Sequence, residues 1–288
     1  MIATRALRRL AAVLAVVWSS ASPAFAEPMA APLSASCDVP LALSAIDGPL
    51  NRTLSRILSG NSLTIVAMGS SSTLGIGASN PASAYPSRLE QELRERFPGV
   101  DIRVINHGVS GQDVPEELTR LGRDVTAEHP DLVIWQVGTN AVLRRDDLSA
   151  DEQLIGRGVA SMKESGIDIV LMDLQYAPRV LARPAVAEME RLIADIARRT
   201  QVGLFRRFEI MKEWDRTQQL APAASIGADG LHMTDASYAC LANRLAEALA
   251  ANWLSQTKLA KSPQRNPDAI AGAGRRAGLP PSTVAPPH

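Results

Sequence analysis

The chain has 288 residues, with 30 basic and 30 acidic side chains, and 46% of its residues are hydrophobic. This length and apolar content suit one domain with a sizeable core. Without residues 1–26, a predicted leader, the net charge is about −3, and for residues 27–258 alone it is about −6. A nucleic-acid-binding domain normally needs a basic face, so we expect no nucleic-acid partner.

The first 26 residues have the pattern of a secretory signal peptide. Three arginines precede the apolar run Leu10 to Val17, and Ala24-Phe25-Ala26 provides an A-x-A site for cleavage after Ala26. The alternative is a membrane anchor, but the run is shorter than the roughly 20 residues of a bilayer span, and no cysteine lies at the cut. We predict an exported protein, periplasmic or secreted, with no stable membrane insertion after cleavage.

The two cysteines of the chain are Cys37, close to the predicted mature N-terminus, and Cys240, in a late helical segment. In an oxidising compartment such a pair is a candidate disulfide. The alternative is two unpaired thiols, with Cys240 filling space in the core. We favour the disulfide, which would join the N-terminal segment to the last helix.

Strand-like and helix-like segments alternate through the middle of the chain. Apolar runs predict strands at Leu63–Met68, Asp101–Ile105, Leu132–Val137, Ile167–Leu174 and Val202–Phe208. Amphipathic or Ala/Leu-rich stretches predict helices at Tyr85–Phe97, Val114–Glu128, Leu148–Glu164, Ala185–Arg199 and Asp235–Leu254. This alternation indicates an α/β fold, a three-layer α/β/α sandwich with a mostly parallel, flavodoxin-like five-stranded sheet. The carboxyl ends of all strands should then lie at one edge, where sites form.

We expect four parts along the chain: the signal peptide 1–26, a lead-in segment 27–62, the domain 63–258 and a disordered Pro/Gly-rich tail 259–288. Neither Gly75-Ile76-Gly77 nor Gly272-x-Gly274 fits a dinucleotide fingerprint. No cluster of His, Cys and carboxylates has the spacing of metal ligands. We therefore predict no cofactor and no metal.

Polar turns follow several of the predicted strands. Gly69-Ser70-Ser71-Ser72 follows the first strand, and Asp229-Gly230-Leu231-His232 precedes the last helix. A nucleophilic serine needs an adjacent base, and the base needs an acid that fixes its tautomer. Of the four histidines, His232 alone has an acid at a spacing that lets both side chains converge, although His107 could line a pocket. This pattern indicates serine-based acyl chemistry.

These turns, in this order, resemble the SGNH (GDSL-type) hydrolase superfamily over roughly residues 63 to 254. The resemblance implies that Ser71 is the nucleophile, His232 the base and Asp229 its orienting acid. The other two blocks fall on Asn106-His107-Gly108 and Gly138-Thr139-Asn140. They imply an oxyanion hole made by the amides of Ser71 and Gly108 and the side chain of Asn140.

Two positions depart from the family pattern. Ser70 stands where the family has Asp before the nucleophile, and Ala141 replaces the Asp that follows the Asn140 position. Neither position is the nucleophile, base or acid, so we expect the chemistry to survive. Both departures weaken any substrate assignment taken from the family. Within the serine run, alignment with the family's Gly-Asp-Ser-Leu block favours Ser71 as the nucleophile, while Ser72 or Thr73 could cap the following helix.

Each of the other polar segments near the predicted site has a functional and a purely structural interpretation. Ser110 is a weaker rival for the nucleophile and is better explained as a loop residue. Arg144 and Arg145 could bind an anionic group of a substrate, although a solvated surface pair explains them better. Gln175-Tyr176-Ala177-Pro178 could line the acyl or alcohol pocket, or form an ordinary turn with a packed tyrosine.

The resemblance implies an exported, monomeric esterase that hydrolyses a small-molecule or glycan ester through an acyl-enzyme. Two alternatives stay open: an acyltransferase of the same fold, and a non-catalytic envelope-binding domain. The sequence does not specify the ester, since acetylated polysaccharide, peptidoglycan, lysophospholipid and small esters all fit.

Overall fold

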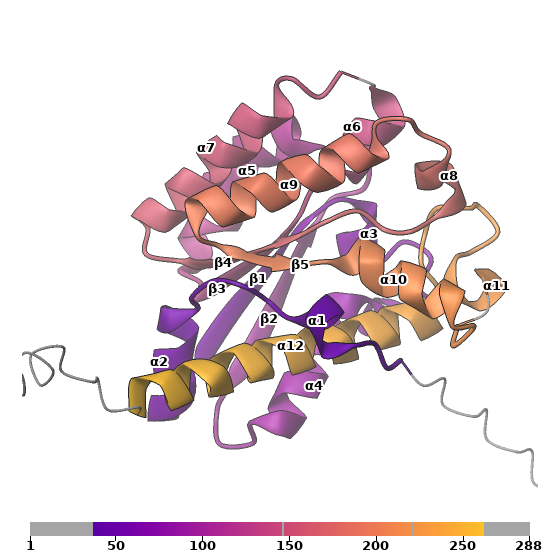
Figure 1. Cartoon of the computed structure of the whole chain (residues 1–288). Coiled ribbons are helices and arrows are strands. Elements are labelled where there is room, and N and C mark those ends of the chain that lie inside the picture. Colours follow the sequence, from indigo (N-terminus) through magenta and orange to yellow (C-terminus); the bar gives the residue numbers. More distant parts are fainter. Residues whose placement is uncertain (1–36, 146, 221, 262–288) are drawn as a thin grey trace, which may run out of the picture. The chain divides into compact units, whose positions relative to one another are not determined.

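The computed structural model describes residues 37–145, 147–220 and 222–261, and a five-stranded parallel sheet lies at its centre (Figure 1). The strands are β1 (Leu63–Gly69), β2 (Ile102–Gly108), β3 (Leu132–Gln136), β4 (Asp168–Met172) and β5 (Gly203–Phe205). Their order across the sheet is β2-β1-β3-β4-β5, and every neighbouring pair is parallel. This is the flavodoxin-like order, which confirms the predicted topology. The predicted signal peptide and most of the predicted tail lie outside the described residues.

Helices cover both faces of the sheet. They are α1 (Leu41–Ser44), α2 (Asn51–Ser59), α3 (Ser71–Leu74), α4 (Tyr85–Arg96), α5 (Val114–Asp124), α6 (Thr139–Arg144), α7 (Asp151–Glu164), α8 (Pro178–Leu181), α9 (Val186–Thr200), α10 (Arg207–Arg216), α11 (Pro222–Ser225) and α12 (Asp235–Lys261). In Figure 1, α5, α7 and α9 lie above the sheet, and α2, α4 and α12 lie below it. All five residues of β3 are buried, as expected for a central parallel strand between two helical layers. The predicted three-layer sandwich is thus confirmed.

Some predicted boundaries are wrong. The fifth strand is only three residues long, and Phe208, placed in it by the sequence, belongs to α10. The reason is a tertiary contact: Asp173 Oδ1 accepts a hydrogen bond of 2.9 Å from the Phe208 amide, in the first turn of α10. The last helix extends to Lys261, beyond the predicted end at Leu254.

The segment before β1, expected as a lead-in, contains helix α2, which is bound to the sheet. Asp168 Oδ2, on β4, accepts hydrogen bonds of 2.9 Å from both the amide and the hydroxyl of Thr53. Asp131, just before β3, accepts from Arg52 Nε at 2.8 Å and Arg56 Nε at 3.0 Å. Carboxylates are favourable near a helix N-terminus. The N-cap residue Leu50 offers no side-chain hydrogen bond, and Asp168 of β4 caps α2 instead.

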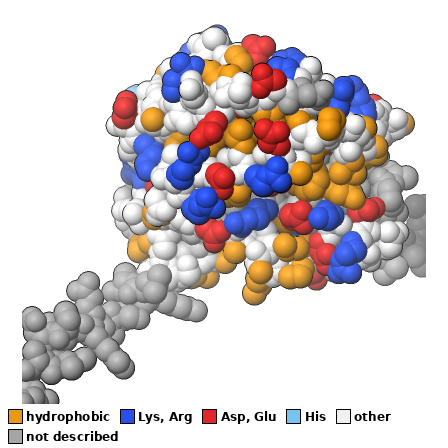
Figure 2. Space-filling view, turned by 45° about the horizontal axis from the view of Figure 1, so that its top comes forward, with side chains coloured by type: hydrophobic (Ala, Val, Ile, Leu, Met, Phe, Trp, Pro, Cys, Tyr) orange, Lys and Arg blue, Asp and Glu red, His pale blue; other side chains and the backbone are white. Residues whose placement is uncertain are grey.

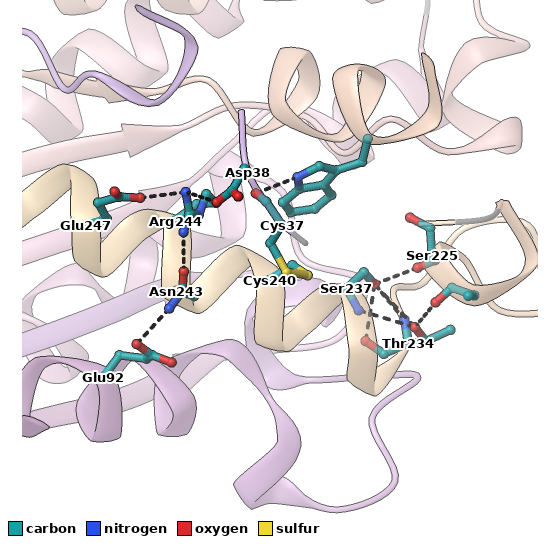
Figure 3. Close-up of a disulfide and its surroundings, with 12 residues drawn as sticks. Cys37, Asp38, Glu92, Ser225, Thr234, Ser237, Cys240, Asn243, Arg244 and Glu247 are labelled. Carbon is teal, nitrogen blue, oxygen red and sulfur yellow. Dashed lines mark hydrogen bonds and ion pairs between the residues drawn. A yellow bond between two sulfur atoms is a disulfide. The ribbon is translucent and has the colours of Figure 1, made fainter. Parts of the chain in front are cut away.

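Cys37 and Cys240 form a disulfide, with their Cα atoms 5.3 Å apart, which confirms the predicted pairing. The bond fastens the start of the described chain to α12 (Figure 3). Trp214, on α10, donates from Nε1 to the Cys37 carbonyl at 3.1 Å. One turn further along α12, Arg244 forms an ion pair of 3.3 Å with Asp38. The segment at Cys37 is thus bound to two helices that are distant in sequence.

The surface shown in Figure 2 carries acidic and basic side chains side by side. Oppositely charged side chains also pair between helices, as Arg199 of α9 and Glu152 of α7 do at 2.6 Å. No large patch of one sign is visible among the described residues on that face. None of the helices in the described part of the chain combines the length and apolar character needed to cross a bilayer.

Candidate active site

Ser71 lies at the carboxyl edge of the sheet, where the chain leaves β1 and starts the short helix α3. The Ser70 carbonyl accepts from the Thr73 and Leu74 amides at 3.1 and 3.0 Å, which makes Ser70 the N-cap residue. The suggestion that Ser72 or Thr73 caps this helix is therefore wrong. Ser71 is 8% exposed, and its hydroxyl points to the loop before α12.

The structure brings Ser71, His232 and Asp229 together. His232 Nε2 lies 2.9 Å from Ser71 Oγ, across 161 residues of sequence. On the other side of the ring, His232 Nδ1 lies 2.5 Å from Asp229 Oδ2. This carboxylate favours the tautomer with the proton on Nδ1, which leaves the Nε2 lone pair facing the serine hydroxyl.

Asp229 is held in place by the backbone of its own loop. Its Oδ1 accepts from the amides of Leu231 and His232, both at 3.0 Å. Burial alone would raise the pKa of Asp229, but these hydrogen bonds and the His232 ring outweigh it and lower the pKa to about 2. The carboxylate thus stays charged across the physiological pH range and can orient the imidazole.

The loop that carries Asp229 and His232 is closed by further contacts. The His232 carbonyl accepts from the Gly227 amide at 2.8 Å, and Ile226 and Met233 form an isolated antiparallel bridge. Gly230 has φ +68°, a left-handed conformation that glycine adopts without steric cost. Gln175, after β4, donates from Nε2 to the Leu231 carbonyl at 3.3 Å. The predicted turn at Gln175 therefore helps to hold the loop of residues 226–233, called the acid–base loop below.

The Asn140 side chain and the Gly108 amide, both expected in the oxyanion hole, have different surroundings. Asn140, in the first turn of α6, donates through Nδ2 to the Gln112 carbonyl at 2.7 Å, and its second N–H remains. The Gly108 amide instead donates to Asn106 Oδ1 at 2.9 Å. A Cβ at Gly108 would come within 2.0 Å of the Leu74 amide nitrogen, so this glycine permits close packing of α3 on β2. The Gly108 amide thus has a side-chain partner on its own strand, β2.

Gln136, the last residue of β3, organises the turn around Ser71. Its Oε1 accepts from the amide and hydroxyl of Ser70 at 3.0 and 2.8 Å, and from Ser72 Oγ at 3.1 Å. Sequence reasoning missed Gln136, which is 66 residues from Ser70. These bonds also explain Ser70, which stands at the family's Asp position: its side chain points into the protein.

Other candidates from the sequence lie elsewhere or have structural partners. His107 Nε2 lies 3.3 Å from Glu128 Oε1. Arg145 is not a solvated surface residue, since it forms ion pairs with the buried Asp113 and Asp151 at 2.6 and 2.8 Å. Arg144 donates to the Gly111 carbonyl.

Tyr176 packs edge-on against Phe208, with ring centroids 5.2 Å apart. It also lines a cavity of about 340 Å³ behind the acid–base loop. The cavity wall includes Pro178, Leu181, Met211, Ile226 and Gly230. Among the described residues, no group of three or more His, Cys, Asp or Glu side chains is arranged to hold a metal ion.

Two curated proteins are similar to parts of this chain. An arylesterase of Vibrio mimicus is 30% identical over 95 residues, which are 33% of this chain and 46% of the relative. An acetylxylan esterase of Geobacillus stearothermophilus is 36% identical over 80 residues, which are 28% of this chain and 33% of that protein. The chain thus spans less than half the length of the curated relatives it matches.

Solved structures share the fold. A two-domain esterase active on acetylated mannans superposes with a TM-score of 0.61 at 21% identity, over 73% of this chain and 56% of its own. A catalytic mutant of an acetylxylan esterase from Geobacillus stearothermophilus superposes with a TM-score of 0.55 at 25% identity. The match covers 66% of this chain and 95% of that protein. The model of the non-GDSL lipase-like family matches residues 36–253. Because this match covers about three quarters of the chain, the protein belongs to the non-GDSL lipase-like family, within the superfamily of SGNH/GDSL-like hydrolases.

Proposed function

We propose that this protein is an exported serine esterase that cleaves a carboxylic ester through an acyl-enzyme on Ser71. The observation that carries the proposal is the continuous chain of two hydrogen bonds from Ser71 Oγ through His232 to Asp229. This arrangement provides a nucleophile, a base within reach of its proton, and an acid that fixes the tautomer of the base.

In the proposed mechanism, Ser71 Oγ attacks the acyl carbon while His232 Nε2 takes the hydroxyl proton. The resulting imidazolium is stabilised by Asp229 and returns the proton to the leaving alcohol. A water molecule then attacks the acyl-enzyme, with His232 as base, and releases the carboxylic acid and the free serine. Asp229 remains ionised throughout, in keeping with its lowered pKa.

The oxyanion that forms in each step needs preorganised donors. We propose the Ser71 amide and the second N–H of Asn140 Nδ2 as two of them. For the third, we propose the Gly108 amide, which would exchange its bond to Asn106 Oδ1 for a bond to the oxyanion. The Gln112 carbonyl holds the Asn140 side chain in place through its other N–H.

For the substrate, we propose a short acyl ester, with an acetyl group on a glycan as the leading class. Relatives described as an acetylxylan esterase and an esterase active on acetylated mannans support this class. Export through the signal peptide would bring the enzyme to such polymers, and the Cys37–Cys240 disulfide supports an oxidising compartment. We propose cleavage after Ala26.

The test is hydrolysis of p-nitrophenyl acetate, butyrate and octanoate, and of acetylated xylan and mannan, by residues 27–288. We expect turnover of acetyl esters to exceed that of octanoate. Ser71→Ala should lose at least about 1,000-fold in kcat, while Ser110→Ala stays near wild type. Wild-type turnover in Ser71→Ala would overturn the proposal. If more acyl group is transferred to added glycan acceptors than to water, the enzyme is an acyltransferase. If no ester is cleaved, the protein is a non-catalytic binding domain.

A further inference from the structure

A buried arginine lies directly behind the nucleophile turn, and the mechanism above does not use it. Arg207, the first residue of α10, has no exposed surface at all. A guanidinium stays charged in proteins, and burying a charge is costly unless it is paired and hydrogen-bonded. The position of this group therefore requires an explanation.

The guanidinium binds the chain on both sides. Arg207 Nη1 donates to Ser72 Oγ at 3.0 Å, and Nη2 donates to the Asp173 carbonyl at 2.6 Å. Ser72 Oγ donates in turn to Gln136 Oε1, which also holds Ser70. The residues on both sides of Ser71 are thus fixed by one network that begins at Arg207.

Among the charged groups around the guanidinium, Asp173 acts on it most strongly. Asp173 is buried, its Oδ1 accepts from the Phe208 amide, and the charge of Arg207 acts on it. Burial and the negative charge of Asp173 raise the pKa of the neighbouring Glu190, so this carboxyl keeps its proton. One negative charge, on Asp173, therefore balances Arg207, and the guanidinium reaches the α3 turn through its bond to Ser72.

We propose that Arg207 is a positioning residue for the esterase reaction: through Ser72 it holds the nucleophile turn in the attacking geometry. The inference rests on the proposed function. Ser71 is in α3, a helix of only four residues, which cannot hold a serine rigidly by its own hydrogen bonds. A misplacement of about 1 Å in a reacting group can lower the rate about 100-fold.

The experiment compares four proteins: wild type, Arg207→Met, Arg207→Lys and the control Arg244→Met. Arg244, on α12, is also a largely buried arginine, and it forms ion pairs with Asp38 and Glu247. Each protein is titrated with a fluorophosphonate so that kcat refers to folded active sites. Arg207→Met should lose about 10- to 100-fold in kcat with KM changed less than about twofold. Arg207→Lys, which keeps the charge and one donor, should recover part of the loss, and Arg244→Met should keep the wild-type kcat.

Ser72→Ala covers the case in which Arg207→Met does not fold. It removes the hydroxyl that accepts from Arg207 and donates to Gln136, and it should lower kcat about 3- to 30-fold with KM unchanged. Because both residues act through one bond, the double variant should lose little more than Arg207→Met alone. Unchanged kcat in Arg207→Met or in Ser72→Ala, with an active wild type, overturns the inference alone. A wild type that hydrolyses no ester overturns the proposed function and the inference with it.

Discussion

At the scale of single residues, the sequence predicts the acid and base but not the groups that hold the nucleophile. Asp229 and His232 are three residues apart, so their pairing can be inferred from local spacing, and the family pattern then selects Ser71. Gln136 and Arg207 reach the same turn from 66 and 135 residues away. No local pattern encodes such contacts, because they depend on how β3 and α10 are placed by the fold. The bond from the Gly108 amide to the Asn106 side chain was likewise not predicted from the sequence.

We predict that Asp229→Asn keeps the fold but loses up to about 10,000-fold in kcat. The asparagine oxygen can still accept from the Leu231 and His232 amides, so the loop should persist. The amide N–H, however, cannot accept the Nδ1 proton, and the imidazole is then held in the wrong tautomer. Steady-state kinetics and near-UV circular dichroism of the variant provide the check. A wild-type kcat would assign the orienting role to another group.

At the scale of elements, the sequence predicted all five strands. Four of them are apolar runs buried between two helical layers, while β2, at the edge of the sheet, is only partly buried. Helix α2 was not predicted as part of the sheet packing. Its N-terminus is capped by Asp168, which is 115 residues away from Thr53, and such a cap has no local signature. Helix α10 was partly misread as strand, since Phe208 is as apolar as the strand before it.

The disulfide gives a prediction at this scale, because it fastens the Cys37 segment to α12. Reduction, or Cys37→Ala with Cys240→Ala, should lower the free energy of unfolding by about 5 kcal/mol for a loop of 203 residues in the chain-entropy model. Urea unfolding of the oxidised protein and of the double variant measures the difference. Equal midpoints and slopes for the two proteins would show that the bond adds nothing to stability. Ser237, one turn before Cys240, binds the Ser225 carbonyl and Thr234 beside the acid–base loop (Figure 3), so activity should fall as well.

At the scale of the whole molecule, several ionisable groups are buried in the described fold, and its stability should depend on pH. Burial raises the pKa of Glu117 to about 7 even though Trp135 Nε1 donates to it at 2.7 Å. Burial and the charge of Asp173 raise the pKa of Glu190 to about 10. A group whose pKa is raised in the folded state binds a proton that the unfolded chain releases. Its contribution is complete below its ordinary pKa of 4.5 and is lost as the pH rises toward the raised value.

Glu190→Gln tests this dependence, since glutamine keeps an N–H that can donate to Asp173 but carries no ionisable proton. Between about pH 6 and 9, the wild type should lose stability relative to the variant, by at most about 1.4 kcal/mol per pH unit. Urea unfolding of both proteins at several pH values gives the two slopes. Parallel slopes would mean that Glu190 is ionised in the folded protein, contrary to the account given above.

The most direct measurement is to quench the mature protein with acid within milliseconds of mixing it with p-nitrophenyl acetate, and to locate any adduct by peptide mass spectrometry. If the hydrogen-bonded chain of Ser71, His232 and Asp229 is the catalytic machinery, one acetyl group should appear on Ser71. It should accumulate in Asp229→Asn only slowly and be absent from Ser71→Ala. An acetyl group on Ser70, Ser72 or Ser110 in the wild type, or hydrolysis without any adduct on Ser71, would contradict the account.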